Sequence, residues 1–304
     1  MEVAPVIAAA EAVAPTGARE LAPSRAADLL ELTKPRITAL VLVTAAVGFA
    51  VGTLGAFDTP RFLLFLLGTA LLCGGASALN QYAEHDADAR MVRTSRRPIP
   101  AGRLRPEEAL RFGLALCATG LAALAGVNLP TLLLGAVSVL SYVLAYTPLK
   151  RVTSLCTVVG AVPGALPPLM GWAAARGSLA PAGWALFAIL FLWQLPHFLA
   201  IGWLYREDYA RGGFPMLGVT DPDGGATGRQ MILYTAALLP VTLAAGILAA
   251  AGRGYLWGAV VLGFLFLGCA VVFAARPNPG AARRMFLVSV LYLPVLLGLM
   301  VFDR

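Results

Sequence analysis

Three side chains that end in oxygen recur at intervals of four residues in one stretch of this chain: Asn80, Glu84 and Asp88. If the stretch is helical, residues four apart lie on one face, so the three groups would point the same way. Such oxygens are the ligands that Mg²⁺ prefers, and Mg²⁺ leaves coordination positions for the phosphates of a substrate. The spacing favours a catalytic Mg²⁺ site, although a solvated helix end with scattered acids would show the same residues.

Arginines follow this acidic stretch directly, at Arg90, Arg93, Arg96 and Arg97. A guanidinium group can bind two phosphate oxygens at once, while carboxylates bind a metal ion that bridges the phosphates. Acids followed by arginines are therefore typical of a metal–diphosphate site. A cytoplasmic membrane loop also collects arginines, so that explanation stays open. We take Arg93 and Arg97 as candidate substrate-binding residues.

A second polar cluster comes much later in the chain and contains Tyr205, Arg206, Glu207 and Asp208. It again places acids beside arginine and tyrosine at the end of an apolar segment. If both clusters open to the same side of a membrane, they form two halves of one site. Asp208 is then a candidate catalytic metal ligand, and Glu207 is either a further ligand or a support for Arg206. Tyr205 and Arg206 are candidate substrate contacts.

Two basic pairs lie beside other apolar segments: Lys34 with Arg36, and Lys150 with Arg151. Their side chains would either bind phosphate oxygens or anchor helix ends among lipid headgroups. Both interpretations stay open at this point, and all four residues are kept as candidate substrate contacts.

One histidine, His197, lies inside an apolar segment beside Gln194. A polar pair at such a depth is costly unless it finds partners. It is either a hydrogen-bonded packing residue or a contact for a planar polar substrate, and we take His197 as a candidate substrate contact.

The composition places these residues in a membrane. Of 304 residues, 59% are hydrophobic and 13% are charged, and the mean hydropathy is +0.78. A soluble domain carries about 25% charged residues, so a soluble, a disordered or a disulfide-stapled chain is excluded. The formal net charge of +7 does not point to nucleic acid, because the basic residues lie in short loops between apolar spans. The four cysteines lie in apolar stretches and are expected to pack there.

Nine apolar spans have about the 20 residues that a helix needs to cross a bilayer. Open strands cannot satisfy their backbone in lipid, so the expected fold is an all-α bundle of nine transmembrane helices. Residues 1–30 are expected to form a disordered tail with a short interfacial helix, and residues 31–304 the membrane domain. The spans are 37–57, 62–80, 108–127, 129–147, 155–175, 182–203, 231–251, 256–274 and 285–302.

Positive charge is distributed unevenly over the connecting segments. With the N-terminus inside, the inner segments hold 18 Lys and Arg, the outer segments hold 4, and Arg111 lies within a span. Basic residues gather on the cytoplasmic side, so the N-terminus and the site loops are expected to be cytoplasmic and the C-terminus outside. The lack of an Arg- and Ser-rich presequence favours a bacterial inner membrane. No acid lies in the middle of a span, which argues against a proton- or ion-coupled transporter.

The motifs resemble those of a known family. Asn80-x-x-x-Glu84-x-x-x-Asp88 resembles the first aspartate-rich motif of the UbiA superfamily of intramembrane prenyltransferases, in which Asp usually stands at the position of Glu84. Further motifs resemble the branch of that superfamily that converts heme B to heme O, and the resemblance covers about residues 30 to 302. These motifs are Leu32-Thr-Lys34-Pro-Arg36, Arg93-Thr-Ser-Arg96-Arg97-Pro98, Phe191-Leu-Trp193-Gln194-Leu-Pro196-His197-Phe198, Tyr205-Arg206-Glu207-Asp208-Tyr209 and Gly213-Phe-Pro215-Met216-Leu217.

The resemblance implies nine helices around a central cavity, with farnesyl diphosphate as donor and the 2-vinyl group of heme B as acceptor. It implies Mg²⁺ held by Asn80, Glu84, Asp88 and Asp208, diphosphate contacts from Arg93, Lys150 and Arg151, and a heme contact from His197. The mechanism would pass through an allylic carbocation. Heme A synthase or proteins of terminal oxidase assembly would then be the partners that receive the product.

Three other functions compete with this one. The same donor chemistry could act on an aromatic quinone precursor, which would need no heme-sized cavity. A transporter or a cofactor-binding membrane protein would keep its function after loss of the carboxylates of Glu84 and Asp88. A scaffold for oxidase assembly would use the N-terminal tail, whose composition is not distinctive.

Overall fold

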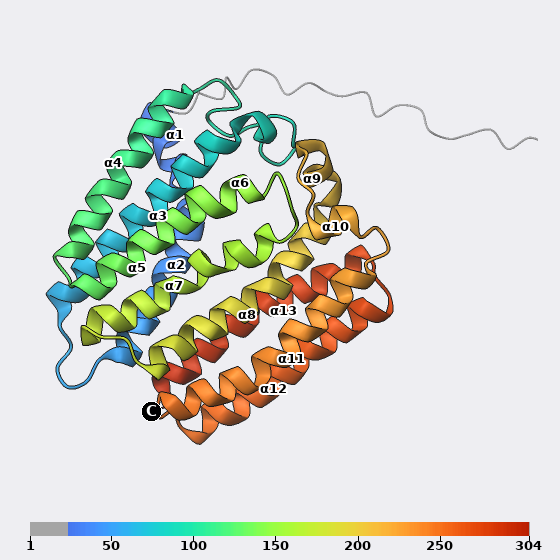
Figure 1. Cartoon of the computed structure of the whole chain (residues 1–304). Helices are drawn as coiled ribbons and strands as arrows, with labels where there is room; N and C mark the ends of the chain where they lie inside the picture. Colours follow the sequence, from blue (N-terminus) through green and yellow to red (C-terminus); the bar gives the residue numbers. More distant parts are fainter. Residues whose placement is uncertain (1–23, 304) are drawn as a thin grey trace, which may run out of the picture.

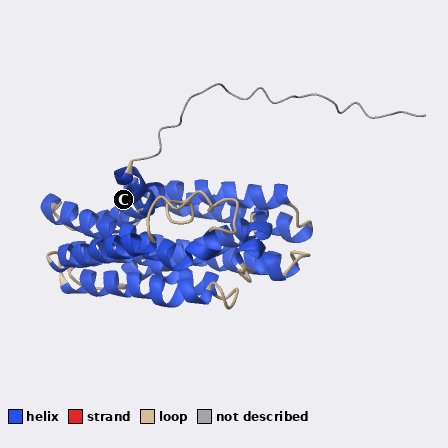
Figure 2. Ribbon diagram, turned by 90° about the horizontal axis from the view of Figure 1, so that it is seen from above, coloured by secondary structure: helices blue, strands red, loops and turns tan. Residues whose placement is uncertain are grey.

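The computed structural model describes residues 24–303, and in this part every regular element is a helix (Figure 2). Of the described helices, nine are long and apolar enough to span a membrane, as the sequence predicts. The order is α1 (Arg25–Leu32), α2 (Pro35–Gly52), α3 (Thr59–Asp88), α4 (Pro106–Ala125), α5 (Leu129–Leu140), η1 (Ser141–Tyr146), α6 (Thr147–Leu149), α7 (Cys156–Arg176), α8 (Pro181–Leu204), α9 (Arg206–Gly212), α10 (Leu217–Thr220), α11 (Gly225–Leu248), α12 (Arg253–Ala275) and α13 (Pro279–Phe302).

Helix boundaries differ from the predicted spans mainly at the polar ends. α3 continues eight residues past the predicted span, through the acidic stretch to Asp88, and α11 begins at Gly225 rather than at 231. Hydropathy marks only the part of a helix that lies in lipid, so it misses turns that project beyond the bilayer. Most of the predicted tail, residues 1–30, lies outside the described residues, and α1 begins within it at Arg25.

Neighbouring helices pack in two groups. α2 lies against α7 and α3 against α4, while α8, α11, α12 and α13 pack on one another, and α7 joins the two groups by packing on α8. α1, the 89–105 loop, α9 and α10 lie at one end of the bundle, and α13 ends at the other (Figure 1). All the predicted clusters of charge therefore share one end, which we call the polar end.

Glycine pairs set how closely α2 and α7 approach. A Cβ added to Gly171 would lie 2.1 Å from the carbonyl oxygen of Ala45, and one added to Gly48 would lie 2.0 Å from that of Pro168. Helix backbones in membrane proteins approach this closely only where the residues between them are small. Lipid provides no hydrophobic driving force for helix association, so this close van der Waals packing stabilises the helix pair. α7 is thereby held in the centre of the bundle.

One span contains a π-helical turn that the sequence does not reveal. η1 interrupts the span between α5 and α6, and single π-turns inside α-helices are frequent at functional sites. Tyr142 and Tyr146 of this turn stack with ring centroids 5.3 Å apart. A Cβ on Gly160 of α7 would lie 2.5 Å from the Tyr146 ring, so the glycine makes room for that ring. The turn leads directly into α6 and Lys150.

Candidate active site

The three residues predicted to share a face of α3 do lie on one helix. α3 runs unbroken to Asp88, and the side chains of Asn80, Glu84 and Asp88 are only 3%, 1% and 1% exposed. Two hydrogen bonds hold this last part of the helix: the Gln81 amide donates to the Leu32 carbonyl at 2.9 Å, and the Thr94 hydroxyl donates to the Asp88 carbonyl at 2.9 Å. The helical spacing inferred from the sequence is therefore confirmed, but the face is buried rather than solvated.

Three cationic side chains meet this face, Arg97 from the loop that follows α3 and two lysines from distant parts of the chain. Lys150 donates to Glu84 Oε2 at 2.8 Å and Arg97 to Asp88 Oδ2 at 2.6 Å. Lys34 donates to Asn80 Oδ1 at 3.3 Å. Burying a carboxylate is costly unless it is paired, so these contacts offset the cost of burying Glu84 and Asp88. The sequence alone left Lys34 and Lys150 as either phosphate contacts or lipid anchors, and in the structure both side chains contact the α3 face.

Each carboxylate keeps one buried oxygen without a partner among the described residues, Glu84 Oε1 and Asp88 Oδ1. A buried acceptor without a hydrogen bond costs free energy unless a ligand satisfies it. Two such oxygens on adjacent turns, beside an amide oxygen, are hard donors of the kind that Mg²⁺ binds. The residues on the α3 face therefore fit a divalent cation.

The lysines differ in how the site affects their charge. Burial, together with the nearby Arg97 guanidinium, lowers the pKa of Lys34 to about 8. Burial alone would also lower the pKa of Lys150, but the Glu84 carboxylate beside it raises that pKa above the usual value. Lys150 thus stays protonated at neutral pH, and an incoming anion near Lys34 would favour its protonated form as well.

The backbone positions Lys34 in an unusual way. Its φ and ψ are 49° and 64°, a left-handed conformation that is uncommon for a residue with a side chain. The preceding helix α1 is fastened to the polar end by Arg103, whose guanidinium contacts Asp28 at 2.7 Å and Glu31 at 2.9 Å. α1 and the Arg103 loop together fix the tight connection between α1 and α2, from which Lys34 extends toward Asn80.

The second cluster is organised differently from the prediction. Asp208 accepts hydrogen bonds from the backbone N–H groups of Val92 at 2.9 Å and Arg93 at 3.2 Å, and it pairs with Arg211 at 2.7 Å. Although burial opposes ionisation, the bonds from Arg211 and from the two backbone groups hold the pKa of Asp208 below its usual range. Asp208 therefore fastens the 89–105 loop, which we call the arginine loop, to α9.

Asp208 and Glu207 do not join the α3 carboxylates around one ion in this structure. Within residues 24–303, no three His, Cys, Asp or Glu side chains lie close enough to share a metal. Glu207 is exposed, and the oxygens of Asp208 already accept three hydrogen-bond donors. The predicted sharing of one metal by both clusters thus differs from the observed geometry, because the loop backbone lies between them.

The remaining basic candidates fall at the edge of the site. Arg151 donates to the Ala83 carbonyl at 2.7 Å and so anchors its loop to α3, while Arg36 is exposed at the start of α2. Neither side chain forms an ion pair with a described residue.

A cleft of about 380 Å³ opens at the polar end; we call it the mouth cleft. It lies between the arginine loop, the end of α8, α9 and the start of α13. Tyr205 and Arg206, both predicted as substrate contacts, line it. Its lining residues are Val92, Arg93, Trp203, Leu204, Tyr205, Arg206, Glu207, Asp208, Arg211 and Pro279.

His197 is part of an aromatic stack between α8 and α13. Its ring lies 5.1 Å from the rings of both Trp193 and Phe286. Its Nδ1 is 2.7 Å from the Ser289 hydroxyl oxygen, and that hydroxyl donates its single proton to the Phe286 carbonyl at 2.6 Å. Ser289 must therefore accept from Nδ1–H, which leaves the Nε2 of neutral His197 with a free lone pair. His197 thus packs α8 against α13 while one ring nitrogen stays available as an acceptor.

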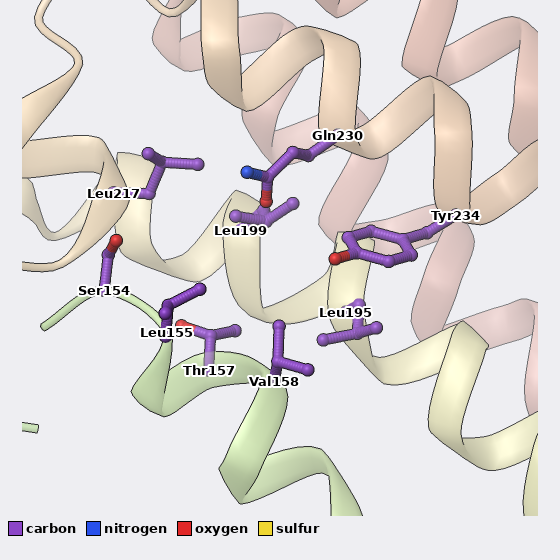
Figure 3. A pocket seen from close by; sticks show the side chains of 9 residues that line it. All are labelled: Ser154, Leu155, Thr157, Val158, Leu195, Leu199, Leu217, Gln230 and Tyr234. Atoms are coloured by element: carbon purple, nitrogen blue, oxygen red, sulfur yellow. The ribbon is translucent and has the colours of Figure 1, made fainter. Parts of the chain in front are cut away.

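A second, smaller pocket of about 50 Å³ lies between α7, α8, α10 and α11. Gln230 and Tyr234 reach into it from α11, while leucines of α8 and α10 form apolar walls (Figure 3). It contains none of the predicted site residues.

Sequence reasoning missed several residues that position the site. Thr147 accepts a hydrogen bond from the Asn80 amide at 3.2 Å, and Ser289 orients His197. Arg103 fastens α1. Each is an ordinary residue whose partner is at least 67 positions away, so no local pattern could reveal it. Gln81 was missed as well, although a polar side chain directly beside Asn80 in an apolar helix is a local signal that sequence reasoning could have used.

The geometry agrees with a family comparison. Residues 41–293 match the model of the UbiA prenyltransferase family. This chain belongs to the UbiA prenyltransferase family. Its UbiA fold is also seen in solved structures: digeranylgeranylglyceryl phosphate synthase covers 91% of the chain with a TM-score of 0.78 at 17% identity. A UbiA homolog from Archaeoglobus fulgidus bound to GPP and Mg²⁺ covers 90% with a TM-score of 0.64 at 17% identity.

Among UbiA relatives, the chain is similar to proteins named protoheme IX farnesyltransferase. The one from Solibacter usitatus is 47% identical over 91% of this chain and 98% of its own length. The one from Myxococcus xanthus is 47% identical over 94% of this chain and 97% of its own length. The predicted family, the nine-helix fold and the assignment as a prenyltransferase are thereby confirmed.

Proposed function

We propose that this UbiA enzyme transfers a farnesyl group from farnesyl diphosphate to a vinyl group of heme B and forms heme O, with Mg²⁺ at the α3 face. The observation that carries the metal and donor part is the pair of unpartnered buried oxygens on Glu84 and Asp88, flanked by Lys34, Arg97 and Lys150. The acceptor rests on the similarity to relatives named protoheme IX farnesyltransferase.

The chain's own residues prepare the site for a leaving diphosphate. Asn80, Glu84 and Asp88 would hold Mg²⁺, which when bound neutralises charge that develops on the diphosphate oxygens. Lys150 and Arg97 are fixed by their carboxylate partners, so their remaining donors need no reorganisation when negative charge appears. Lys34 adds a further positive group. Arg93, stacked on tyrosines, closes the side toward the mouth cleft.

Cleavage of the bond between C1 and oxygen sends its electron pair to the diphosphate and leaves an allylic cation. The terminal vinyl carbon of heme then bonds to C1, and water supplies a hydroxyl to the neighbouring carbon as its proton leaves. An apolar helical surround delays contact of the first cation with water. Asp208 contributes by holding the arginine loop in place. Glu207 lines the mouth cleft and would be a further contact for a substrate there.

We propose the bacterial inner membrane as the location, with the polar end in the cytoplasm. The distribution of Lys and Arg supports this orientation, since all but a few lie in segments that join the polar end. Heme O formed there would pass to a heme A synthase or to a terminal oxidase.

His197 is proposed to contact the acceptor through the free Nε2. His197→Phe keeps a flat ring in the stack but removes that nitrogen, so we expect the KM for heme B to rise about tenfold, the value of one charge-free polar contact in a dry site. The KM for farnesyl diphosphate should not change. Steady-state kinetics with each substrate varied in turn checks this, and an unchanged KM for heme would make His197 a packing residue only.

The function is tested by incubating the purified protein in detergent with heme B, farnesyl diphosphate and Mg²⁺, followed by mass spectrometry of the heme. We expect a product heavier by one farnesyl and one hydroxyl group, and none with EDTA. A preparation that binds farnesyl diphosphate but leaves heme unmodified would contradict the acceptor. Prenylation of a hydroxybenzoate in that preparation would assign the aromatic acceptor instead.

A further inference from the structure

Two guanidinium groups line the mouth cleft without an acidic partner. Neither Arg93 nor Arg206 forms an ion pair with a carboxylate of the described chain, residues 24–303. The third arginine of the lining, Arg211, is neutralised by Asp208 at 2.7 Å. Setting that pair aside, Arg93 and Arg206 face one carboxylate, the exposed Glu207, so the cleft keeps an excess of positive charge.

Aromatic rings hold both guanidinium groups in place. The Arg206 guanidinium lies 4.6 Å from the ring of Trp203, which is itself only 3% exposed. The Arg93 guanidinium lies 5.2 Å from the Tyr205 ring and 5.5 Å from the Tyr209 ring. A guanidinium stacked on a ring can present its N–H edge to a carboxylate and form two parallel hydrogen bonds. The Arg206 edge forms no hydrogen bond with a described residue, whereas one N–H of Arg93 donates to the Tyr209 hydroxyl at 3.4 Å. The cleft is thus prepared for carboxylate ligands.

The mouth cleft is separate from the α3 face, where the proposed function places the diphosphate. Lys34, Arg97 and Lys150 already serve the α3 face. Tyr209 lies at the boundary, because its ring centroid is 5.9 Å from Lys150 Nζ and 5.5 Å from the Arg93 guanidinium. Arg206 has no contact with any residue of the α3 face and belongs to the cleft alone.

We propose that the mouth cleft binds the two propionate carboxylates of the heme acceptor, with Arg206 as the main contact and Arg93 as the second. This inference rests on the proposed function, which supplies heme as acceptor. Heme carries both carboxylates on one edge, and the rest of its rim is apolar. With the carboxylates in the cleft at the polar end, the apolar rim with its vinyl groups enters the bundle. The cleft would therefore set which edge of heme faces the farnesyl donor.

A chemical change in the substrate, combined with a change in the protein, tests this contact. Heme B and its dimethyl ester, which lacks both carboxylates, are compared as substrates for wild type and for Arg206→Gln. We expect the variant to raise the KM for heme B about tenfold, because a charge-assisted hydrogen bond is lost. For the dimethyl ester the two proteins should have the same KM. The KM for farnesyl diphosphate should be unchanged throughout.

Two further variants keep the test decisive. Arg206→Lys retains the charge and should recover part of the affinity for heme B, which a purely structural role of the Trp203 contact would not predict. Arg283→Gln, an exposed arginine at the same end but outside the cleft lining, should behave as wild type.

Each outcome decides a different point. An equal loss for heme B and for its dimethyl ester in Arg206→Gln would overturn the propionate contact. A raised KM for farnesyl diphosphate with an unchanged KM for heme would assign the cleft to the donor instead. Failure of wild type to farnesylate heme B at all would overturn the proposed function, and it is seen before any variant is compared.

Discussion

Glu84→Gln and Asp88→Asn are each expected to lower turnover by about 10²–10³, the size of effect seen when one preorganised charge-stabilising group is removed from an active site. Both changes keep the size of the side chain, so packing on α3 is preserved. Each removes the carboxylate that pairs with Lys150 or Arg97 and that carries the unpartnered oxygen proposed to bind Mg²⁺. The Mg²⁺ concentration for half-maximal activity should also rise.

The measurement is the rate of heme farnesylation as a function of Mg²⁺ concentration. Asp86→Asn is the matched control, because Asp86 lies on the same helix but is exposed and contacts only His85. Thermal unfolding in detergent should be recorded for all three variants, since removing one partner leaves a buried cation unpaired. Near-normal turnover of folded Glu84→Gln and Asp88→Asn would refute the metal site on α3.

Gly171→Ala is expected to destabilise the folded bundle by about 3 kcal/mol or more, at or above the upper end of the usual cost of overpacking. The added methyl would lie 2.1 Å from the Ala45 carbonyl oxygen and 2.6 Å from the Phe49 backbone nitrogen. These are backbone atoms of α2, which cannot rotate away as a side chain would. α2 must therefore shift as a whole, and Lys34 at its start would shift with it.

Gly268→Ala on α12 is the matched control, since the same methyl would meet no atom within 4 Å. It should leave stability unchanged or raise it slightly, because alanine favours a helix over glycine. The midpoint of thermal unfolding in detergent and the yield of monodisperse protein compare the two variants. Equal stability of Gly171→Ala and Gly268→Ala would show that α2 and α7 do not depend on this close approach.

Much of the architecture could be predicted from local composition. A segment of about 20 apolar residues must be a helix in lipid, so hydropathy alone yields nine spans. The spacing of Asn80, Glu84 and Asp88 likewise required only that α3 continue, which it does. Family motifs then narrowed the chemistry, and the model of the UbiA prenyltransferase family matches residues 41–293.

The contacts between elements could not be predicted in the same way. Nothing in the sequence told whether Lys34, Lys150 and Arg151 bind phosphate or lipid, and the fold divides them: two lysines reach the α3 face, and Arg151 holds a backbone carbonyl. Asp208 was expected at the metal because of its type, yet it caps the backbone of the arginine loop.

The sequence by itself determined the class of protein, the number of spans and the side chains available for metal and phosphate, because these depend on local hydrophobicity and on spacing along single helices. The tertiary structure decided which oxygen is free, which cation pairs with which carboxylate, and which nitrogen of His197 carries a lone pair. Most of these depend on partners far apart in the chain, such as Glu84 with Lys150 and His197 with Ser289, which only helix packing brings within hydrogen-bonding distance.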